Sequence, residues 1–410
     1  MARLAVPPGV RPWLATAARL LLAGVWLWAG LAKVGDPAAS VRAVRAYRLL
    51  PEWLAQGVGY GLPFLELTLA ALLLIGLAVR VAAAVSAGLL VVFLAGMISA
   101  AARGLQIECG CFGGGGDLAA GQSTSYTVEI VRDTALLLVA LALVRWPRSR
   151  YAVDNAVRAA AESAVDPGRI GPRRTAEARR RLAELAERRR RQADQRLRLT
   201  GAVAGVLLVL VTGVGIGIQA ARASTGDGPT PQAVTLADGV TVGRSSARIT
   251  MDVYADPQCP ACRQFEAESG AAIADWIDAG TVRVNYHVVS FLDAASTTRY
   301  SSRAANALYC GADAGIFERY HQLLFANQPP EGSAGLTYDQ LVQLGQQAGA
   351  PAGGEFETCV RNRPYADFVS RITDRASRNG VLSTPTVLVA GEPVQPATLA
   401  NLRAAVDRAT

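Results

Sequence analysis

The chain has 410 residues, of which 51% are hydrophobic and only 18% charged, and its formal net charge is +8. This length predicts two or three structural units, and so apolar a composition excludes a wholly water-soluble enzyme. Residues 145–199 hold 16 Arg and 7 acidic residues, a net charge of +9, so the basic excess belongs to one segment. Nucleic-acid binding is excluded, because it needs basic side chains spread over a folded face with aromatic residues between them.

Long apolar stretches dominate the first half of the chain, at residues 14–32, 56–79, 81–102 and 126–144. Each is long enough to cross a hydrocarbon core of about 30 Å as a helix. We therefore predict a membrane domain over residues 1–145, an all-α bundle of four spanning helices. The first stretch runs on into Lys33 without a convincing cleavage site, so we expect it to be retained.

The Arg-rich segment sets the expected orientation. Basic residues near span ends stay in the cytoplasm, so we predict that residues 146–199 are a cytoplasmic linker, helical and resting on anionic lipid. An apolar stretch at 200–220 predicts a fifth transmembrane helix, and everything after it is then extracytoplasmic in a bacterial cell membrane. In this orientation the loop 33–52 must face outward, although it carries four basic residues. The 16 Arg of the linker are the stronger orientation signal, so we follow them.

A soluble domain is expected after the last span. Residues 221–238 are rich in Ser, Thr, Gly and Pro, which predicts a flexible tether, and residues 239–410 have the periodicity of an α/β domain. The expected elements are a strand at 247–254, a helix ending near 279, a strand at 282–291, helices between 297 and 378, a strand at 385–389 and a helix at 396–408. This order is that of a thioredoxin fold with a helical insertion.

The predicted first strand and helix of this domain are joined by Cys259-Pro260-Ala261-Cys262. A cysteine at a helix N-terminus faces unpaired N–H groups and the positive end of the helix dipole, which favour its thiolate. Cys259 is therefore the expected nucleophile and Cys262 the resolving thiol. The alternatives are a static disulfide or half of a zinc site, and the chain offers neither a second CxxC nor a His pair with zinc spacing. No metal is expected.

A Thr384-Pro385 pair lies just before the last predicted strand. In thioredoxin-like folds a cis proline opposite the CxxC presents backbone to an extended substrate chain, and we expect a cis bond here. The alternative is an ordinary trans proline that begins a strand. Thr384 and Pro385 are therefore predicted to be site residues.

Three motifs of the soluble domain occur together: Tyr254-Ala255-Asp256-Pro257-Gln258 before the CxxC, Phe265-Glu266 after it, and Ser383-Thr384-Pro385-Thr386. On these motifs residues 239–410 resemble the DsbA-like family. The resemblance implies a domain that passes disulfides to exported proteins, or shuffles them, with no bound cofactor. Ala261 stands where strongly oxidising members carry His, which leaves the direction of exchange open.

Cys310 and Cys359 fall in the helical insertion, far from the CxxC. We predict that they form a structural disulfide closing a loop of about 50 residues. A second redox pair is the alternative.

The membrane half carries its own set of motifs: Arg19, Ala29-Gly30-Leu31-Ala32-Lys33, Asp36-Pro37, Tyr47-Arg48-Leu49-Leu50-Pro51, Leu62-Pro63, Glu66 and Cys109-Gly110-Cys111-Phe112-Gly113. On these, residues 15–145 resemble the MauE/DoxX family of four-span membrane proteins. The MauE branch is associated with disulfide formation in exported proteins, often beside a thioredoxin-like partner, which here is fused. A disulfide between Cys109 and Cys111 closes a strained ring that exchanges readily, so we expect a redox pair rather than a structural one.

Glu66 and Arg132 are charged residues inside predicted spans. Intramembrane charges are costly and are usually paired inside the bundle. One interpretation is a structural Glu66–Arg132 ion pair, and the other is that both line a quinone or proton path.

All six cysteines lie on the outer side in this topology. An outer pair suits oxidation, because a conduit for cytosolic electrons needs thiols that can be reached from inside. We therefore expect Cys259–Cys262 to oxidise the thiols of exported proteins and Cys109–Cys111 to reoxidise it, with a membrane quinone as acceptor. The alternatives are a reductase or isomerase recharged by another protein, and a non-enzymatic scaffold anchored by the membrane half.

Overall fold

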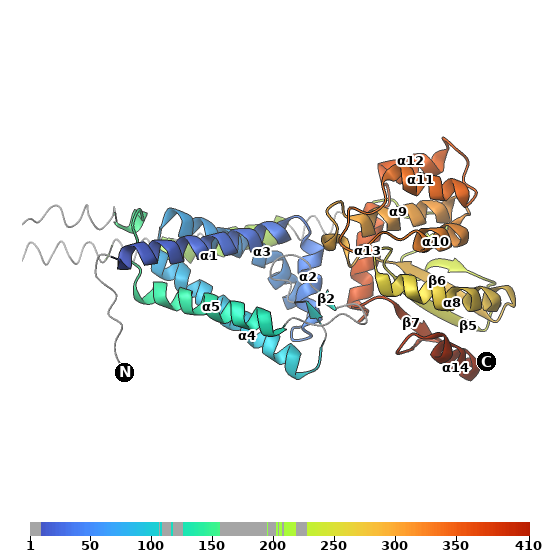
Figure 1. The fold of residues 1–410 in the computed structure, drawn as a ribbon, viewed down its shortest axis with the longest axis horizontal. Helices are drawn as coiled ribbons and strands as arrows, with labels where there is room; N and C mark the ends of the chain where they lie inside the picture. The colour runs from blue at the N-terminus through green and yellow to red at the C-terminus, as the bar shows by residue number, and fades with distance from the viewer. Residues whose placement is uncertain are drawn as a thin grey trace, which may run out of the picture. The chain divides into compact units, whose positions relative to one another are not determined.

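The computed structural model describes residues 10–105, 107–108, 116–117, 126–155, 209–218 and 228–410, together with positions 195, 202, 203, 205 and 206. The chain divides into two compact units, one made mostly of the first half and the other holding residues 220–410. Each unit is described by itself. Figure 1 shows the labelled elements in chain order, from blue to red.

Helices make up most of the described first half. They are α1 (Arg11–Val34), α2 (Pro37–Ala46), α3 (Glu52–Ile75), α4 (Val79–Ala102) and α5 (Tyr126–Arg145). By length and hydropathy, α1, α3 and α4 are able to cross a membrane. The 20-residue helix α5 is less apolar, because Glu129, Arg132 and Asp133 lie in its first half. Val209–Ile218, inside the predicted fifth span, is a shorter apolar helix.

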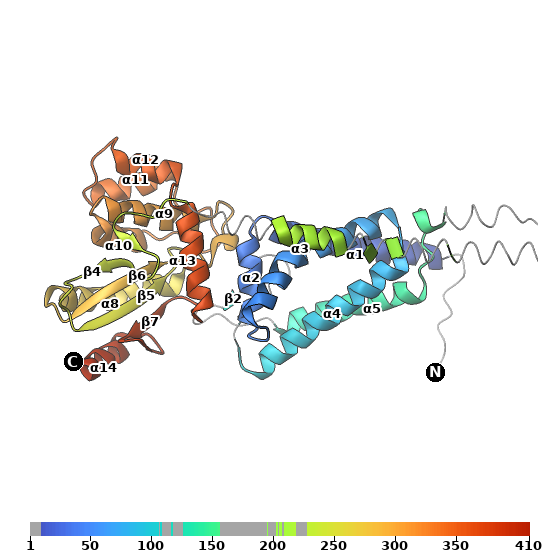
Figure 2. The ribbon, with the colours of Figure 1, turned by 180° about the vertical axis from the view of Figure 1, so that it is seen from behind.

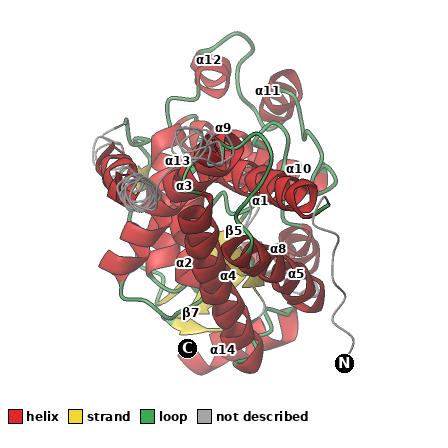
Figure 3. Ribbon diagram, turned by 90° about the vertical axis from the view of Figure 1, so that its left-hand side faces the viewer, coloured by secondary structure: helices red, strands yellow, loops and turns green. Residues whose placement is uncertain are grey.

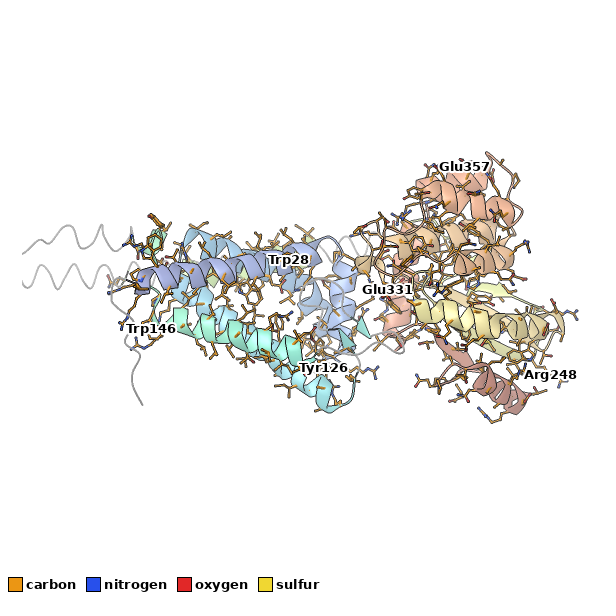
Figure 4. The ribbon with its side chains drawn as sticks, viewed as in Figure 1. Trp28, Tyr126, Trp146, Arg248, Glu331 and Glu357 are labelled. Atoms are coloured by element: carbon orange, nitrogen blue, oxygen red, sulfur yellow. A yellow bond between two sulfur atoms is a disulfide. The ribbon has the colours of Figure 1, made fainter. Side chains whose placement is uncertain are left out.

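Alanine and leucine side chains fill the interior of this helical unit, around the fully buried Leu22, Leu69 and Leu73. Trp26 of α1 is buried among them, and its indole N–H donates to Ser86 Oγ of α4 at 2.9 Å. Trp28 of the same helix, labelled in Figure 4, is 68% exposed. Apolar side chains inside and outside the unit suit helices surrounded by lipid.

The predicted redox loop of the membrane half is only partly described. Strand β1 (Ile107–Glu108) pairs with β2 (Gly116–Asp117) in an antiparallel register that sets Ile107 opposite Asp117. Cys109 and Cys111 lie between these strands, outside the described residues, as does most of the 146–199 linker.

The second unit contains a six-stranded sheet. Its strands are β3 (Val234–Thr235), β4 (Gly239–Val242), β5 (Ile249–Ala255), β6 (Val282–Val288), β7 (Thr386–Val389) and β8 (Glu392–Pro393), in the spatial order β3-β4-β6-β5-β7-β8. β5 and β6 are parallel, and the other neighbours are antiparallel. Figure 2 shows β4, β6 and β5 side by side.

Helices cover both faces of this sheet; Figure 3 colours the helices red and the strands yellow. They are α8 (Pro260–Asp278), α9 (Tyr300–Asp313), α10 (Phe317–Ala326), α11 (Tyr338–Gln347), α12 (Glu355–Asn362), α13 (Ala366–Arg378) and α14 (Leu399–Ala409), with a short 3-10 turn, η2 (Asp293–Ala295). Alternate residues of β5, such as Met251 and Val253, are buried in one core with Ile273 of α8. Tyr254, on the opposite face, packs in a smaller cluster with Ala376 of α13. The unit is an α/β thioredoxin-like domain with a helical insertion, as predicted.

The domain begins earlier than the predicted boundary at residue 239. β3 lies within the predicted tether and pairs with β4, with Val234 opposite Val240. Upstream of β3, the Gly228 carbonyl accepts from Arg371 Nη2 at 3.0 Å. The composition of this segment suggested a tether, but side chains distant in the sequence bind its backbone.

Candidate functional site

The candidate site lies where β5 ends and α8 begins. Cys259 is the N-cap of α8, with extended backbone angles (φ −73°, ψ 117°), and Pro260 occupies the first turn. No side chain caps this helix end. The free N–H groups of the first turn and the helix dipole therefore favour negative charge at the cap position. Cys259 and Cys262 are both unpaired thiols and fully buried.

The second part of the site comes from the segment before β7. The Thr384–Pro385 peptide bond is cis, which confirms the prediction. The Thr384 carbonyl oxygen accepts a hydrogen bond from Cys259 Sγ at 3.3 Å. The structure thus brings Cys259, Cys262, Thr384 and Pro385 together, as the sequence predicts.

The two thiols have opposite electrostatic environments. A hydrogen bond with Cys262 lowers the pKa of Cys259 below its ordinary value, although burial opposes this effect. Burial raises the pKa of Cys262 well above its ordinary value. Cys259 is therefore the more readily ionised of the two thiols.

Asp256 supports the loop before the CxxC, a role that sequence reasoning did not assign. Its buried carboxyl group accepts from the Gln258 backbone N–H at 2.8 Å and from the Leu292 N–H at 2.9 Å. Ser301 Oγ, on α9, donates to the same carboxyl group at 2.6 Å. Burial raises the pKa of Asp256 to about 7. The motif was visible in the sequence, but its partners on two other elements were not.

Gln328 is a second support that the sequence did not indicate. Its side-chain amide donates to the carbonyl of Pro257 at 3.0 Å and to that of Cys259 at 2.9 Å. Gln328, which belongs to the helical insertion, therefore binds the backbone on both sides of the Cys259 N–H group. No motif marks Gln328.

Cys310 and Cys359 form the predicted disulfide, with Cα atoms 5.9 Å apart. It joins α9 to α12, and Asn306 Nδ2 donates to the Cys359 carbonyl beside it at 3.4 Å. The pair lies inside the helical insertion, so it connects helices rather than serving the CxxC.

The predicted Glu66–Arg132 pair is wrong. Glu66 Oε1 accepts instead from Lys33 Nζ at 2.6 Å, and both side chains are buried in the helical unit. Arg132 Nε donates to its neighbour Asp133 at 2.8 Å. A lysine at the end of α1 meets Glu66 of α3, and pairing between helices cannot be read from spacing along the chain. Within the described residues, no group of three His, Cys, Asp or Glu side chains could hold a metal ion.

Comparison with known proteins divides the chain into two parts. Residues 11–145 match the family model of the methylamine utilisation protein MauE, and residues 235–408 match that of thioredoxin. The methylamine utilization protein MauE of Paracoccus denitrificans is 32% identical over 135 residues, which cover 33% of this chain and 70% of that protein.

Two mycobacterial proteins are also similar. The serine/threonine-protein kinase PknE of Mycobacterium tuberculosis is 36% identical over 126 residues, 28% of this chain. The match spans about a fifth of the kinase, 22% of its length. The solved structure of the reduced disulfide bond oxidoreductase DsbG from Mycobacterium tuberculosis has 31% sequence identity and a TM-score of 0.38, covering 43% of this chain and 88% of that one.

Proposed function

Because the chain belongs to the MauE family through its membrane domain and joins to it a thioredoxin-like domain, we propose that it is a membrane-anchored thiol–disulfide oxidoreductase. The observation that carries the proposal is the contrast between the two CxxC thiols. Cys259 lies at the N-terminus of α8 with a lowered pKa, and the pKa of Cys262 is raised.

The proposed direction is oxidation of the thiols of exported proteins. A substrate thiolate attacks Cys259 Sγ of the Cys259–Cys262 disulfide, and Cys262 leaves with the electron pair and takes up a proton. A second substrate thiolate attacks the substrate sulfur of the mixed disulfide, and Cys259 leaves as a thiolate. The substrate loses two electrons and gains a disulfide, while the CxxC pair gains both electrons. The hydrogen bond with Cys262 stabilises the departing Cys259 thiolate.

We propose that the membrane half restores the CxxC disulfide. The Cys259 thiolate attacks the Cys109–Cys111 disulfide, Cys262 resolves the mixed disulfide, and the two electrons pass to Cys109 and Cys111. A membrane quinone is the proposed final acceptor, since it takes up two electrons and two protons. Lys33 and Glu66 are the residues that would hold it: Lys33 Nζ would donate to a quinone oxygen, and Glu66 Oε2, which is buried with no hydrogen-bond partner within the described residues, would accept from a hydroxyl of the quinol.

The proposed topology has four spans, a cytoplasmic Arg-rich linker and a fifth span, with the thioredoxin-like domain on the outer face of a bacterial membrane. The Arg content of residues 145–199 supports this orientation. A reporter that is active only outside the cytoplasm should be active when fused after residue 223 and inactive when fused near residue 174. The reverse pattern would remove the basis for the proposed direction.

The decisive experiment is thiol trapping of Cys259 and Cys262 in living cells, with and without the Cys109→Ser substitution. We expect a mostly oxidised pair in the wild type and a mostly reduced pair in the variant. A pair that is reduced in both indicates a reductase or isomerase recharged by another protein. A pair that is oxidised in both assigns the membrane half to anchoring alone.

A further inference from the structure

A cavity of about 640 Å³ lies beside the active-site helix, between α8 and α10. Its mouth is exposed, and Arg263, one turn along α8 from Cys259, lies on its rim. Glu266 of α8 and His321 of α10 form its floor. The proposed thiol exchange uses none of these side chains.

The floor of the cavity holds two polar atoms without partners. Glu266 Oε1 and His321 Nε2 make no hydrogen bond with any described residue, and they lie 3.8 Å apart, too far to bond to each other. The Glu266 side chain is 10% exposed and that of His321 is 3% exposed. Buried polar groups are nearly always hydrogen-bonded, so two orphaned atoms facing one cavity indicate a missing partner.

The chemistry of the site selects the class of that partner. Burial lowers the pKa of His321 to about 3, so its imidazole is neutral and can offer a lone pair. Glu266 offers carboxylate oxygens. A donor about 2.9 Å from both atoms fits their spacing, and a group with several N–H donors and no acceptor satisfies both at once.

The walls and rim favour positive charge on the ligand. The rings of Tyr286, Phe317 and Phe325 surround His321, with centroids 4.8 to 5.4 Å from its own. Aromatic faces attract cations. Besides Arg263, the charged groups that line the cavity are acidic: Glu266 and Asp278 on α8 and Glu318 on α10. An anion would meet these carboxylates, and a metal ion would find too few oxygen ligands.

We propose that this cavity binds an organic cation, an alkylammonium or guanidinium group on an apolar stem, which donates to Glu266 Oε1 and His321 Nε2 while the stem lies along the aromatic wall. Such a group occurs both in the basic side chains of polypeptides and in free amines. The site does not depend on the proposed thiol exchange, so it can be tested separately.

Binding should be coupled to proton release. Burial raises the pKa of Glu266 to about 8, and a cation binds only the ionised carboxylate. The affinity should therefore rise about 25-fold between pH 6.5 and pH 8.5. The other titratable groups at the cavity are Arg263, Asp278, Tyr286, Glu318 and His321, and Asp278 and Glu318 are exposed at the rim.

The test is saturation-transfer NMR on the detergent-solubilised full chain with N-acetyl-lysine methylamide at pH 8.5. The matched neutral probe is N-acetyl-norleucine methylamide, which has the same apolar stem without the ammonium group. We expect the lysine probe to bind at least tenfold more tightly than the norleucine probe. Glu266→Gln should remove this preference, and the matched control Glu268→Gln, on the same helix but not lining the cavity, should keep it.

A second variant tests the cavity independently, in case Glu266→Gln does not fold. Ala271→Leu places a larger side chain on an exposed wall of the cavity, and leucine is a good helix former. This variant should also weaken binding of the lysine probe. Equal binding of the probe to wild type and to either variant would overturn the proposal, as would no binding to the wild type.

The source of the cation is decided by exchange kinetics. If a lysine near the cysteine of a substrate peptide lowers KM in the wild type but not in Glu266→Gln, then the ligand is a polypeptide side chain. If lysine and norleucine peptides have equal KM values while the amide probe still binds, then the ligand is a free amine.

Discussion

The backbone carbonyl of Thr384 lies 3.3 Å from the sulfur of Cys259, although 125 positions separate the two residues in the sequence. This contact joins the start of the active-site helix to the segment that leads into β7. An extended chain lying along that segment would therefore bring its own sulfur next to Cys259.

The two CxxC cysteines should fail in different ways when substituted. Cys259→Ser should abolish disulfide exchange with a cysteine peptide, because the serine hydroxyl cannot form the mixed disulfide. Cys262→Ser should instead accumulate mixed disulfides with a disulfide-bonded peptide, since Cys262 is no longer there to attack Cys259 Sγ and release the peptide, and these are seen as reductant-sensitive adducts on gels. Normal turnover of Cys262→Ser would show that the assigned roles are wrong.

The Cys259 thiol should ionise, and so become reactive, at a lower pH than an ordinary thiol. Its pKa is lowered chiefly by the hydrogen bond with Cys262, so alkylation by iodoacetamide should rise with pH and reach its plateau earlier than for a model peptide. Cys262→Ala removes the donor and should move this midpoint to higher pH. The measurement is the alkylation rate of the Cys259 peptide by mass spectrometry, and an unchanged midpoint in Cys262→Ala would exclude this cause.

Asp256 should make the stability of the domain depend on pH. Its carboxyl group ionises near 3.8 when unfolded but only near 7 when folded. The folded state therefore holds an extra proton between these values, and the free energy of unfolding should fall by about 3 kcal/mol as the pH rises from 4 to 7. Asp256→Asn should abolish this difference.

Asp256→Ala is the comparison variant, because it leaves two backbone N–H groups and Ser301 Oγ without their acceptor. It should destabilise the domain by about 3 kcal/mol at pH 5. Pulse proteolysis of the full chain in urea, followed with a C-terminal antibody, measures both variants. A wild-type stability that rises between pH 4 and 7 relative to Asp256→Asn would contradict the sign.

The Cys310–Cys359 disulfide should stabilise the domain without taking part in exchange. Replacing both cysteines by alanine opens a loop with a sequence separation of 49, which should cost about 4 kcal/mol in the chain-entropy model. The same proteolysis assay measures the loss. Peptide oxidation by the folded double variant should remain within a factor of two, and a much larger loss of activity would reveal a second redox pair.

The two halves should exchange directly within one chain. In a Cys262→Ser, Cys111→Ser double variant treated with a mild thiol oxidant, which takes up the two electrons, Cys259 should form a trappable disulfide with Cys109, because covalent fusion gives the partners a high effective concentration. The product should migrate as a monomer with reductant-sensitive mobility, and tryptic mapping should find the two peptides joined. If Cys259 is caught only on other proteins, then the membrane half does not recharge it.

Features carried by short motifs could be predicted from the sequence. Cys259 and Cys262 lie at a strand-to-helix junction, and Thr384-Pro385 lies before an apolar strand. The local sequence pattern is therefore enough to predict the position of each pair in the fold. The sequence did not predict Lys33 as the partner of Glu66, nor Gln328 as a support of the Cys259 carbonyl. Both depend on which helix packs against which, and no spacing along the chain determines that.

The first two strands of the domain illustrate a different limit. β3 has two residues and β4 four, set in a segment of turn-forming composition. Neither has enough alternating positions to stand out from a tether. β3 pairs with β4, and β4 pairs in turn with β6, some 40 positions away, with Val240 opposite Tyr286.

The same short strands form one margin of the sheet, and the two-residue β8, which ends in Pro393, forms the other. Exposed strand edges act as templates on which extended chains can assemble into β-aggregates. A domain that meets unfolded polypeptides at the membrane would be especially vulnerable to this kind of capture. With two-residue edge strands, and a proline that lacks a backbone donor at one of them, the sheet offers very few backbone groups with which another extended chain could pair.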